Sequence, residues 1–280
     1  MPNAISNTPL SLEIAARTDP GTLRTLNEDS IATVDELGLL VLSDGMGGYQ
    51  SGDVASKLTT QVIVEGVTQG LQGKPCHNSS EVAAMVENVV KRANHAIYQE
   101  GQQRAQRIHS SQEQAMGSTL ALLLFRKNHV TMAHVGDSRI YRLRANRLEL
   151  LTHDHSLLQE QIDQGILSTE AAATSHNRHL VTRGLGLQAE VAVTLDECEA
   201  LPGDIYLLCS DGLNDMVDNA DIELVLNSLQ ANLPLAASQL VMIANDNGGE
   251  DNISVILART GTQPPPATEK SGFFSWLFGR

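Results

Sequence analysis

Residues 118–151 read STLALLLFRKNHVTMAHVGDSRIYRLRANRLELL, and this stretch decides the fold. It contains four strand-like runs, namely STLALLLF, HVTMAHV, RIYRLR and RLELL. Asn128 and Asn146 stand between neighbouring runs, where the turns of β-hairpins are expected. Hairpins join antiparallel strands, so the stretch predicts antiparallel sheet.

Helical patterns lie on both sides of this stretch. Residues 51–69 and 80–105 look helical, and residues 220–246 hold two further helical patterns, the second opened by Pro234. In the segment 80–105, apolar residues recur at three- and four-residue steps, which predicts one buried stripe. The stripe consists of Val82, Met85, Val89, Ala93 and Ile97.

Further strands are predicted before and after these helices. The strand-like runs are SLEIAART, SIATVD, GLLVLSD, EVAVTLDE, DIYLLCSD and NISVILAR. The run Leu39–Leu42 is apolar on both faces, as in a strand that is covered on both sides. Hairpins dominate over regular strand–helix alternation, so we expect an α+β domain with helices packed outside antiparallel sheets. A doubly wound parallel fold is the second choice.

Composition divides the chain into a body and two ends. We expect a domain over residues 11–260, preceded by an N-terminal extension at 1–10. Residues 156–178 are polar and indicate an excursion on the surface of this domain. Residues 261–280 form a proline-rich linker followed by GFFSWLFGR. This apolar tail is either a docking element or a segment that folds back onto the body.

The charge balance excludes one class of function. The chain has 19 basic and 33 acidic side chains and a net charge of -14. A nucleic-acid binder needs a basic face, so we expect no nucleic-acid partner. A cluster of carboxylates that binds cations remains compatible with a phosphate site.

The cysteines and the hydropathy pattern bear on location. Cys76, Cys198 and Cys209 are odd in number and widely spaced, which argues against a disulfide framework. The first residues do not resemble a signal peptide, and no window has the ~20 consecutive apolar residues of a membrane span. We therefore expect a cytoplasmic protein.

Aspartates stand next to several of the strand-like runs. Asp44 closes GLLVLSDGMGG, Asp137 follows HVTMAHVG, Asp211 closes DIYLLCSDG, and Asp251 precedes NISVILAR. Carboxylates at strand ends can converge at one edge of a sheet. Their oxygens suit Mg²⁺ or Mn²⁺, whereas zinc prefers histidine and cysteine. The pair His153 and His155 is more simply explained by hydrogen bonds within a loop.

Eight motifs together resemble a known family. In order along the chain they are TLRTLNED, LSDGMGGYQSGDVAS, MGSTLALLL, AHVGDSRIYRLR, LTHDHS, LVTRGLG, LLCSDGL and EDNISVILAR. This ordered set closely resembles the metal-dependent protein phosphatases of type 2C, in particular the small bacterial serine/threonine members. The resemblance spans roughly residues 11–259. It implies a four-layer α-β-β-α sandwich in which helices flank two antiparallel sheets.

The resemblance also implies a metal centre with two or possibly three Mn²⁺ or Mg²⁺ ions. Asp44 would bridge two metals, and the carbonyl of Gly45 would help to hold the first. Asp211 and Asp251 would bind the second metal. Asp137, together with Asp211, matches the position that supports a third, weaker metal.

Other positions match residues around that centre. Glu28 and Asp29 would orient metal-bound waters, and Arg24 would bind the substrate phosphate. Asn252 is expected to anchor the loop of Asp251. Residues 156–178 would form a flap beside the site. Met46 replaces the histidine of many eukaryotic relatives, a proposed general acid, so a metal-bound water is the expected proton donor.

These residues suggest a hydrolase. Two cations lower the pKa of a shared water, and the resulting hydroxide attacks the phosphorus of phosphoserine or phosphothreonine. Phosphorylated proteins are the implied substrates, with a serine/threonine kinase or its targets as partners. The alternatives are a catalytically silent phosphatase-like module that regulates a partner, and a metallohydrolase of small phosphorylated metabolites.

Overall fold

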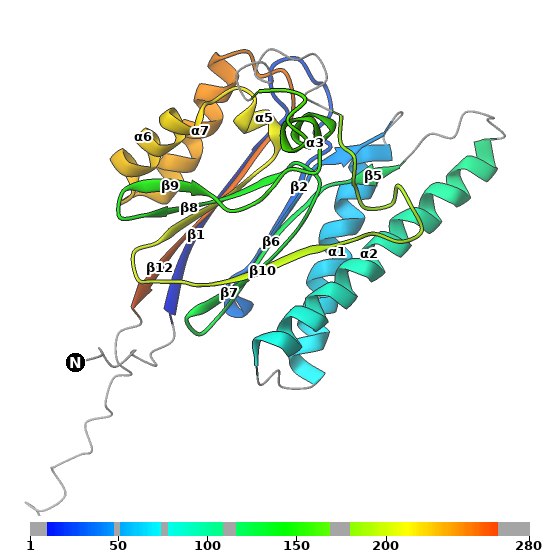
Figure 1. Cartoon of the computed structure of the whole chain (residues 1–280), viewed down its shortest axis with the longest axis horizontal. Coiled ribbons are helices and arrows are strands. Elements are labelled where there is room, and N and C mark those ends of the chain that lie inside the picture. The colour runs from blue at the N-terminus through cyan, green and yellow to red at the C-terminus, as the bar shows by residue number, and fades with distance from the viewer. Residues whose placement is uncertain (1–9, 48–50, 74–77, 109–115, 169–179, 263–280) are drawn as a thin grey trace, which may run out of the picture.

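The computed structural model describes residues 10–47, 51–73, 78–108, 116–168 and 180–262. Two five-stranded antiparallel sheets lie face to face in it (Figure 1). The first sheet has the order β1 (Leu10–Asp19), β12 (Ile253–Thr262), β11 (Ile205–Cys209), β8 (Arg139–Arg144) and β9 (Arg147–Leu150). The second sheet has the order β10 (Thr194–Glu199), β7 (His129–Val135), β6 (Leu120–Arg126), β3 (Leu39–Ser43) and β2 (Ser30–Val34).

Both hairpins predicted within residues 118–151 are present. Arg126 pairs with His129 across the turn at Asn128, and Arg144 pairs with Arg147 across the turn at Asn146. The two hairpins belong to different sheets, because the short connection between β7 and β8 crosses from the second sheet to the first. Asp137 lies in this connection.

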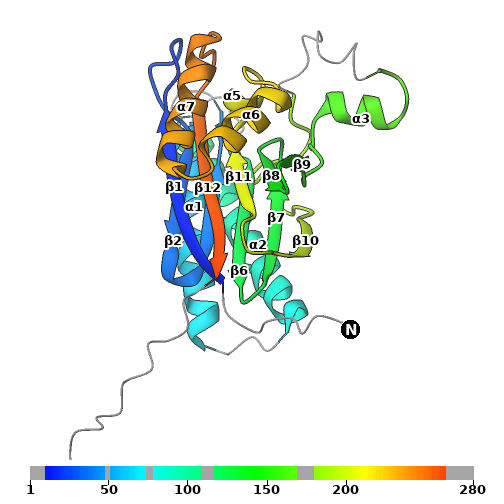
Figure 2. The same ribbon diagram turned by 90° about the vertical axis from the view of Figure 1, so that its left-hand side faces the viewer.

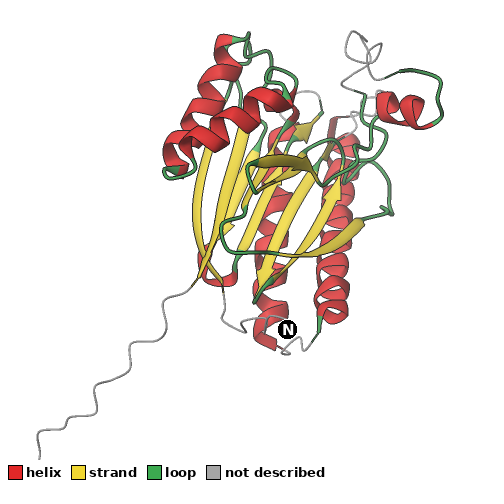
Figure 3. Ribbon diagram, turned by 60° about the vertical axis from the view of Figure 1, so that its left-hand side comes forward, coloured by secondary structure: helices red, strands yellow, loops and turns green. Residues whose placement is uncertain are grey.

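Helices cover the outer face of each sheet. Helices α1 (Ser51–Gly73) and α2 (Ser79–Ile108) lie against the second sheet, and α6 (Asn219–Leu229) and α7 (Leu233–Asp246) lie against the first (Figures 1 and 2). The order of layers is therefore helix, sheet, sheet, helix, which confirms the α+β sandwich and excludes the doubly wound parallel fold. Figure 3 shows the two yellow sheets between the red helices.

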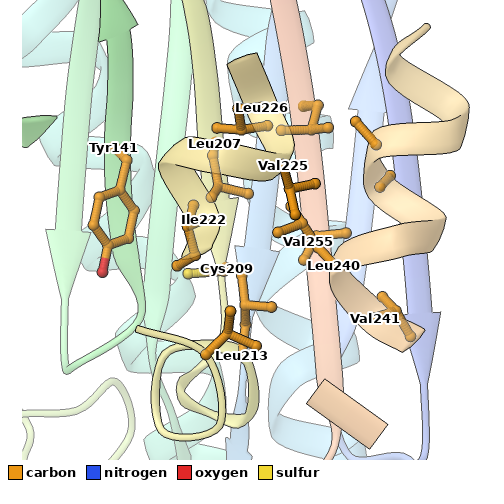
Figure 4. Packing of buried hydrophobic residues seen from close by; sticks show 14 of the residues in the cluster. Tyr141, Leu207, Cys209, Leu213, Ile222, Val225, Leu226, Leu240, Val241 and Val255 are labelled. Atoms are coloured by element: carbon orange, nitrogen blue, oxygen red, sulfur yellow. The ribbon is translucent and has the colours of Figure 1, made fainter. Parts of the chain in front are cut away.

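The strand at Leu39–Leu42 is buried on both faces, as predicted. Leu39 and Val41 pack with α1 and α2, while Leu40 and Leu42 pack between the two sheets. On the far side, Leu207 and Val255 of the first sheet meet Leu226 of α6 (Figure 4). Each fully buried aliphatic side chain stabilises the fold by roughly 1.5 to 3 kcal/mol, so three apolar layers hold the four structural layers together.

The predicted stripe of α2 also faces the core. Val82, Val89, Ala93 and Ile97 are buried against the second sheet, and Met85 is packed beside them. Helix α7 opens as expected, with Pro234 in its first turn and the side chain of Asn232 accepting a hydrogen bond from the Leu235 amide.

The structure adds elements that the sequence pattern did not predict. Strands β4 (Gly45–Met46) and β5 (Gly117–Ser118) form a small separate sheet, helix α5 (Asp211–Asn214) is one turn long, and η1 (Asp35–Leu37) is a 3-10 turn. Elements this short have no hydrophobic period that could reveal them.

Parts of the predicted ends and flap lie outside the described residues. The excursion at 156–178 begins with α3 (Leu157–Asp163), and residues 169–179 are not described. The same holds for residues 1–9 and 263–280, so the extension and the apolar tail remain predictions. Within the described ranges, every helix is too short or too polar to cross a bilayer.

The two ends of the sandwich carry different connections. At one end, which we call the aspartate end, the strands adjoin the acidic residues Asp29, Asp44, Asp137, Asp211 and Asp251. At the opposite end, which we call the turn end, lie the turns of the hairpins β2–β3, β6–β7 and β8–β9. Because neighbouring strands run in opposite directions, each strand has either its first or its last residue at the aspartate end. Residues distant in sequence therefore meet there.

Candidate active site

Thr119 holds the loop of Asp44 in place. The Asp44 amide donates a hydrogen bond to Thr119 Oγ1 at 2.9 Å, and the Thr119 amide donates one to the Asp44 carbonyl at 2.8 Å. The same Thr119 hydroxyl lies 2.6 Å from the hydroxyl of Ser138, which follows Asp137. One buried threonine therefore connects the loops of Asp44 and Asp137.

His155 holds the other side of the Asp137 loop. Its Nδ1 accepts a hydrogen bond from the Gly136 amide at 3.0 Å, and its own amide donates to the Gly136 carbonyl at 2.9 Å. Gly136 has a φ of 104°, and a Cβ there would lie 2.7 Å from the Thr119 side chain, so only glycine fits.

The imidazole of His155 is neutral. Burial, with a smaller contribution from the ring of His134 stacked 4.6 Å away, lowers the pKa of His155 to about 3. Nδ1 accepts the Gly136 N–H, and Nε2 lies 3.1 Å from Thr194 Oγ1 and 3.0 Å from Arg183 Nη1. His155 therefore hydrogen-bonds a loop, and His153 pairs instead with Asp163 at 2.7 Å.

Asp29 connects the two sheets at the aspartate end. It is buried, and its Oδ2 accepts a hydrogen bond from Ser210 Oγ at 2.8 Å. Ser210 in turn accepts a hydrogen bond from the Ser254 amide at 2.9 Å. The second carboxylate oxygen of Asp29, Oδ1, is buried without a hydrogen-bond partner among the described residues. A buried acceptor in this state needs a water or a cation.

Asn252 ties the loop of Asp251 to the loop between β1 and β2. Its side-chain amide donates to the carbonyls of Pro20 and Leu26, each at 2.9 Å, and its Oδ1 accepts from the Glu28 amide at 2.7 Å. These three bonds use both donor hydrogens and the carbonyl oxygen of a buried side chain, and each spans more than two hundred residues of sequence. The two loops therefore form one unit.

Arg24 lies on the surface of this unit. Its Nη2 is 2.7 Å from Asp251 Oδ2, and 52% of the Arg24 side chain is exposed. An exposed ion pair of this kind contributes only about 0 to 1 kcal/mol. The guanidinium thus lies beside Asp251, and little free energy is needed to move it away.

Two glycines allow the backbone of the Asp44 loop to approach helix α1. A Cβ at Gly45 would lie 2.1 Å from the Gly52 carbonyl oxygen, and a Cβ at Gly52 would lie 2.6 Å from the Gly45 carbonyl oxygen. A Cβ at Gly52 would also lie 2.8 Å from a carboxylate oxygen of Glu28, whose backbone carbonyl accepts a hydrogen bond from the Gly45 amide. Larger residues would push these groups apart.

The carboxylates at the aspartate end disfavour one another's charge. Burial is the largest effect: it raises the pKa of Asp29 to about 7 and raises the pKa values of Asp44 and Asp137 well above the usual range. Like charges add to this effect. The pKa of Asp44 is raised further by Asp29, Asp211, Asp137 and Asp251. The other four aspartates are therefore close enough to Asp44 to affect its ionisation.

The chemistry of these side chains suits hard cations, although the side chains do not surround a single metal position. Across the described ranges, no three acidic, histidine or cysteine side chains stand close enough to hold one metal ion between them. The donors at this end are nevertheless oxygens, and Asp29 Oδ1 is a buried acceptor for which the described residues provide no hydrogen-bond donor. A bound cation would offset the burial and the like-charge repulsion that raise the pKa values of Asp29, Asp44 and Asp137.

Two arginines lie near the predicted site and contact residues other than the proposed metal ligands. Arg139 binds Asp154 through two nitrogens, with the shorter contact at 2.7 Å, and so joins β8 to the loop before α3. Arg183 Nη1 lies 3.0 Å from His155 Nε2. Both arginines therefore support the surroundings of Asp137.

Sequence reasoning missed the residues that connect the loops. Thr119, Ser210 and His155 were not assigned to the site, although each lies within a motif that carries the family resemblance. Their contacts bridge sequence separations of 19 residues or more. For Thr119 and Ser210, a small hydroxyl residue beside a strand end was the only available signal, and it does not identify a partner. For His155, the predicted hydrogen bonding of a loop is confirmed, although its partner Gly136 was not identified.

Comparisons with known proteins agree with this architecture. The family model for protein phosphatase 2C matches residues 24–241. Serine/threonine protein phosphatase PstP of Mycobacterium tuberculosis is 36% identical over 89% of this chain, and the chain spans only 45% of that protein. Serine/threonine phosphatase stp of Listeria welshimeri is 33% identical over 86% of this chain and 93% of its own length.

A solved structure is similar over nearly the whole described body. The crystal structure of the catalytic domain of PstP in complex with 2 manganese ions has a TM-score of 0.76 and 34% identity, and the match covers 90% of this chain and 99% of that one. The family model and the solved structure both match most of the chain, so this chain belongs to the protein phosphatase 2C family.

Proposed function

We propose that this protein is a metal-dependent serine/threonine protein phosphatase. The observation that carries the proposal is the gathering of five carboxylates from separate loops at one end of the sandwich, where burial and the four other acids disfavour the charge of Asp44. Its relatives are named serine/threonine phosphatases, and one was crystallised with manganese, which supports the same chemistry here.

We assign the cation ligands to the aspartates at this end. Asp44 would bridge two Mn²⁺ or Mg²⁺ ions, with the Gly45 carbonyl on the first ion and Asp211 and Asp251 on the second. Asp137 and Asp211 would hold a third, weaker ion. Glu28 and Asp29 would orient the surrounding waters, and Asn252 would keep the loop of Asp251 in position through its three hydrogen bonds.

The cations, when bound, lower the pKa of a shared water so that hydroxide is available near neutral pH for attack on phosphorus. Arg24 would bind the phosphoryl oxygens, because its guanidinium presents two parallel N–H donors. For this it exchanges the exposed contact with Asp251 for the substrate. The Met46 side chain cannot donate a proton, so the leaving serine or threonine oxygen would take its proton from a metal-bound water.

The physiological role follows from the proposed activity. Phosphorylated proteins, among them a serine/threonine kinase or its targets, would be the substrates. Cys198 and Cys209 are free thiols in the described part of the chain, which is compatible with a reducing compartment such as the cytoplasm. The apolar tail at 272–280 would serve partner capture rather than catalysis.

The proposal is tested with a phosphothreonine peptide and a Mn²⁺ titration. We expect hydrolysis that needs Mn²⁺ or Mg²⁺ and stops in excess chelator. Asp211→Asn should lower the turnover by roughly 100-fold or more and weaken Mn²⁺ binding measured by calorimetry, because a ligand charge is removed. Full activity in the chelator, or in Asp211→Asn, would defeat the proposal.

The two alternatives give different results in the same assay. A catalytically silent module would bind phosphopeptide without releasing phosphate at any Mn²⁺ concentration. A metabolite hydrolase would release phosphate from sugar phosphates faster than from phosphopeptides. The complete set of Asp44, Asp137, Asp211 and Asp251 favours the active phosphatase over the silent module.

A further inference from the structure

The loop between β1 and β2 presents two leucines to solvent beside Arg24. Leu23 is 70% exposed and Leu26 is 47% exposed. Single exposed leucines are common on protein surfaces. These two differ because they stand on either side of the arginine that we assign to the substrate phosphate.

Backbone hydrogen bonds fix the loop segment that carries these leucines. On one side of Arg24, the amides of Thr22 and Leu23 donate hydrogen bonds to the Gly249 carbonyl at 2.9 and 3.3 Å. On the other side, the Leu26 carbonyl accepts a hydrogen bond from the buried Asn252 side chain at 2.9 Å. The backbone around both leucines is thus tied to the loop that carries Asp251.

Gly21 strengthens this attachment. It has a φ of 79°, and a Cβ there would lie 2.3 Å from the Asp251 carbonyl oxygen. Only glycine permits the loop to lie this close to the loop of Asp251. The apolar surface of the two leucines is therefore held at a constant place relative to the carboxylates.

We propose that Leu23 and Leu26 contact apolar side chains of the substrate that lie next to its phosphoserine or phosphothreonine. This inference rests on the proposed phosphatase function. An extended peptide advances about 3.3 to 3.6 Å per residue. When its phosphate is at Arg24, side chains one or two positions away pass over the leucines, and an apolar pair excludes water there.

The alternative explanation is that the leucines merely support the loop. For Leu23 the exposed fraction argues against this role, because a residue that is 70% exposed contributes little packing to its own fold. The leucines of α6 and α7 provide a comparison: Leu224 and Leu235 are 63% and 48% exposed on outer helices. They lie on elements that do not carry Arg24.

The experiment compares two phosphothreonine peptides that are identical except for leucine or serine at the positions flanking the phosphothreonine. We expect the wild-type protein to hydrolyse the leucine-flanked peptide with a kcat/KM roughly 10-fold higher. The double variant L23S/L26S should lose this preference and keep its kcat/KM for the serine-flanked peptide. The matched control L224S/L235S should keep the preference.

The outcomes separate the inference from the proposed function. If the wild-type protein hydrolyses neither peptide with Mn²⁺, the phosphatase function itself fails. If it hydrolyses both equally well, or if L23S/L26S retains the preference, the inference about the leucines is overturned while the function stands. An equal loss for both peptides in L23S/L26S also overturns it, because that result indicates support of the Arg24 loop.

Discussion

The aspartate end and the turn end of the sandwich use the same strands in different ways. At the turn end, acidic and basic groups mix: a groove of about 760 Å³ is lined by Asp35, Glu36, Arg126, Lys127 and His129, among others. At the aspartate end five carboxylates gather, and burial together with the neighbouring acids raises the pKa values of Asp29, Asp44 and Asp137. The first end carries side chains of both charge signs, whereas the second carries carboxylates, whose charge we propose is neutralised by bound cations.

The two ends also differ in how their loops are connected. The turn end closes its hairpins locally, with Lys127, Ala145 and Asn146 at φ values of 55°, 49° and 63°. The aspartate end joins loops that are far apart in sequence, as in the bond from Asn252 to the Leu26 carbonyl. Local turns contribute to stability alone, whereas a network of distant loops can position a reactive group.

The largest effect is expected from removing an acid at the aspartate end. Asp44→Asn should reduce Mn²⁺-dependent phosphopeptide turnover by roughly 100-fold or more and lower the affinity for Mn²⁺, because the proposed bridging ligand loses its charge. Turnover against Mn²⁺ concentration and calorimetric binding measure both effects.

Asp35→Asn is the matched control for Asp44→Asn, since Asp35 is an exposed acid at the turn end. It should leave turnover within about two-fold of the wild-type value. Comparable losses in the two variants would show that acidic charge in general, rather than its position, matters.

A smaller effect is expected at Thr119, which connects the loops of Asp44 and Asp137. Thr119→Val removes the hydroxyl at nearly constant volume, and about a 10-fold loss of turnover with weaker Mn²⁺ activation should follow. Thr119→Ser keeps the hydroxyl and should restore Mn²⁺ affinity. If the serine variant is as impaired as the valine variant, packing rather than the hydrogen bonds determines the effect.

A pH effect is expected from the neutral His155. Its pKa is about 3 in the folded protein and about 6.5 in the unfolded chain. Below pH 6.5 the unfolded chain binds the proton and the folded protein does not, so this histidine lowers the free energy of unfolding as the pH falls from 6.5 towards 3. His155→Asn keeps an acceptor for the Gly136 amide but does not titrate.

Denaturant unfolding of the wild type and His155→Asn between pH 7 and pH 4 measures this effect. The buried aspartates contribute with the opposite sign, because their raised pKa values let the folded state bind protons first. The difference between the two proteins isolates His155. A difference that stays constant over this pH range would contradict a neutral, buried ring.

The smallest effect is expected at the turn end. Ala145 has a left-handed φ of 49°, a conformation that glycine adopts without steric cost. Ala145→Gly should raise the free energy of unfolding by roughly 0.5 to 1 kcal/mol and leave turnover unchanged. A change of turnover in this variant would break the distinction between the two ends.

Sequence reasoning went far for elements with a clear period. The stripe of α2, the doubly buried strand at Leu39–Leu42 and the turns at Asn128 and Asn146 follow from local patterns, and the structure confirms each. Its limits were the one-turn helix α5 and the small sheet of β4 and β5. These form because distant segments hold them, as when the Ser118 amide donates to the Leu185 carbonyl.

The candidate site divides in the same way. The aspartates could be identified because each adjoins an apolar run, and the family motifs named their roles. Thr119, Ser210 and His155 could not, because their partners are 19 to 181 residues away. Hydrogen bonds of this kind exist only after the sheets have packed.

The amino-acid sequence by itself determined which segments become strands and helices, since burial of an apolar face imposes a period of two or 3.6 residues. It also determined that acids adjoin the strand ends. Only the tertiary structure decided which strands share a sheet: β7 and β8 are neighbours in sequence but lie in different sheets, and β11 lies between β8 and β12. Strand order depends on how whole apolar faces pack together, and no local period records that choice.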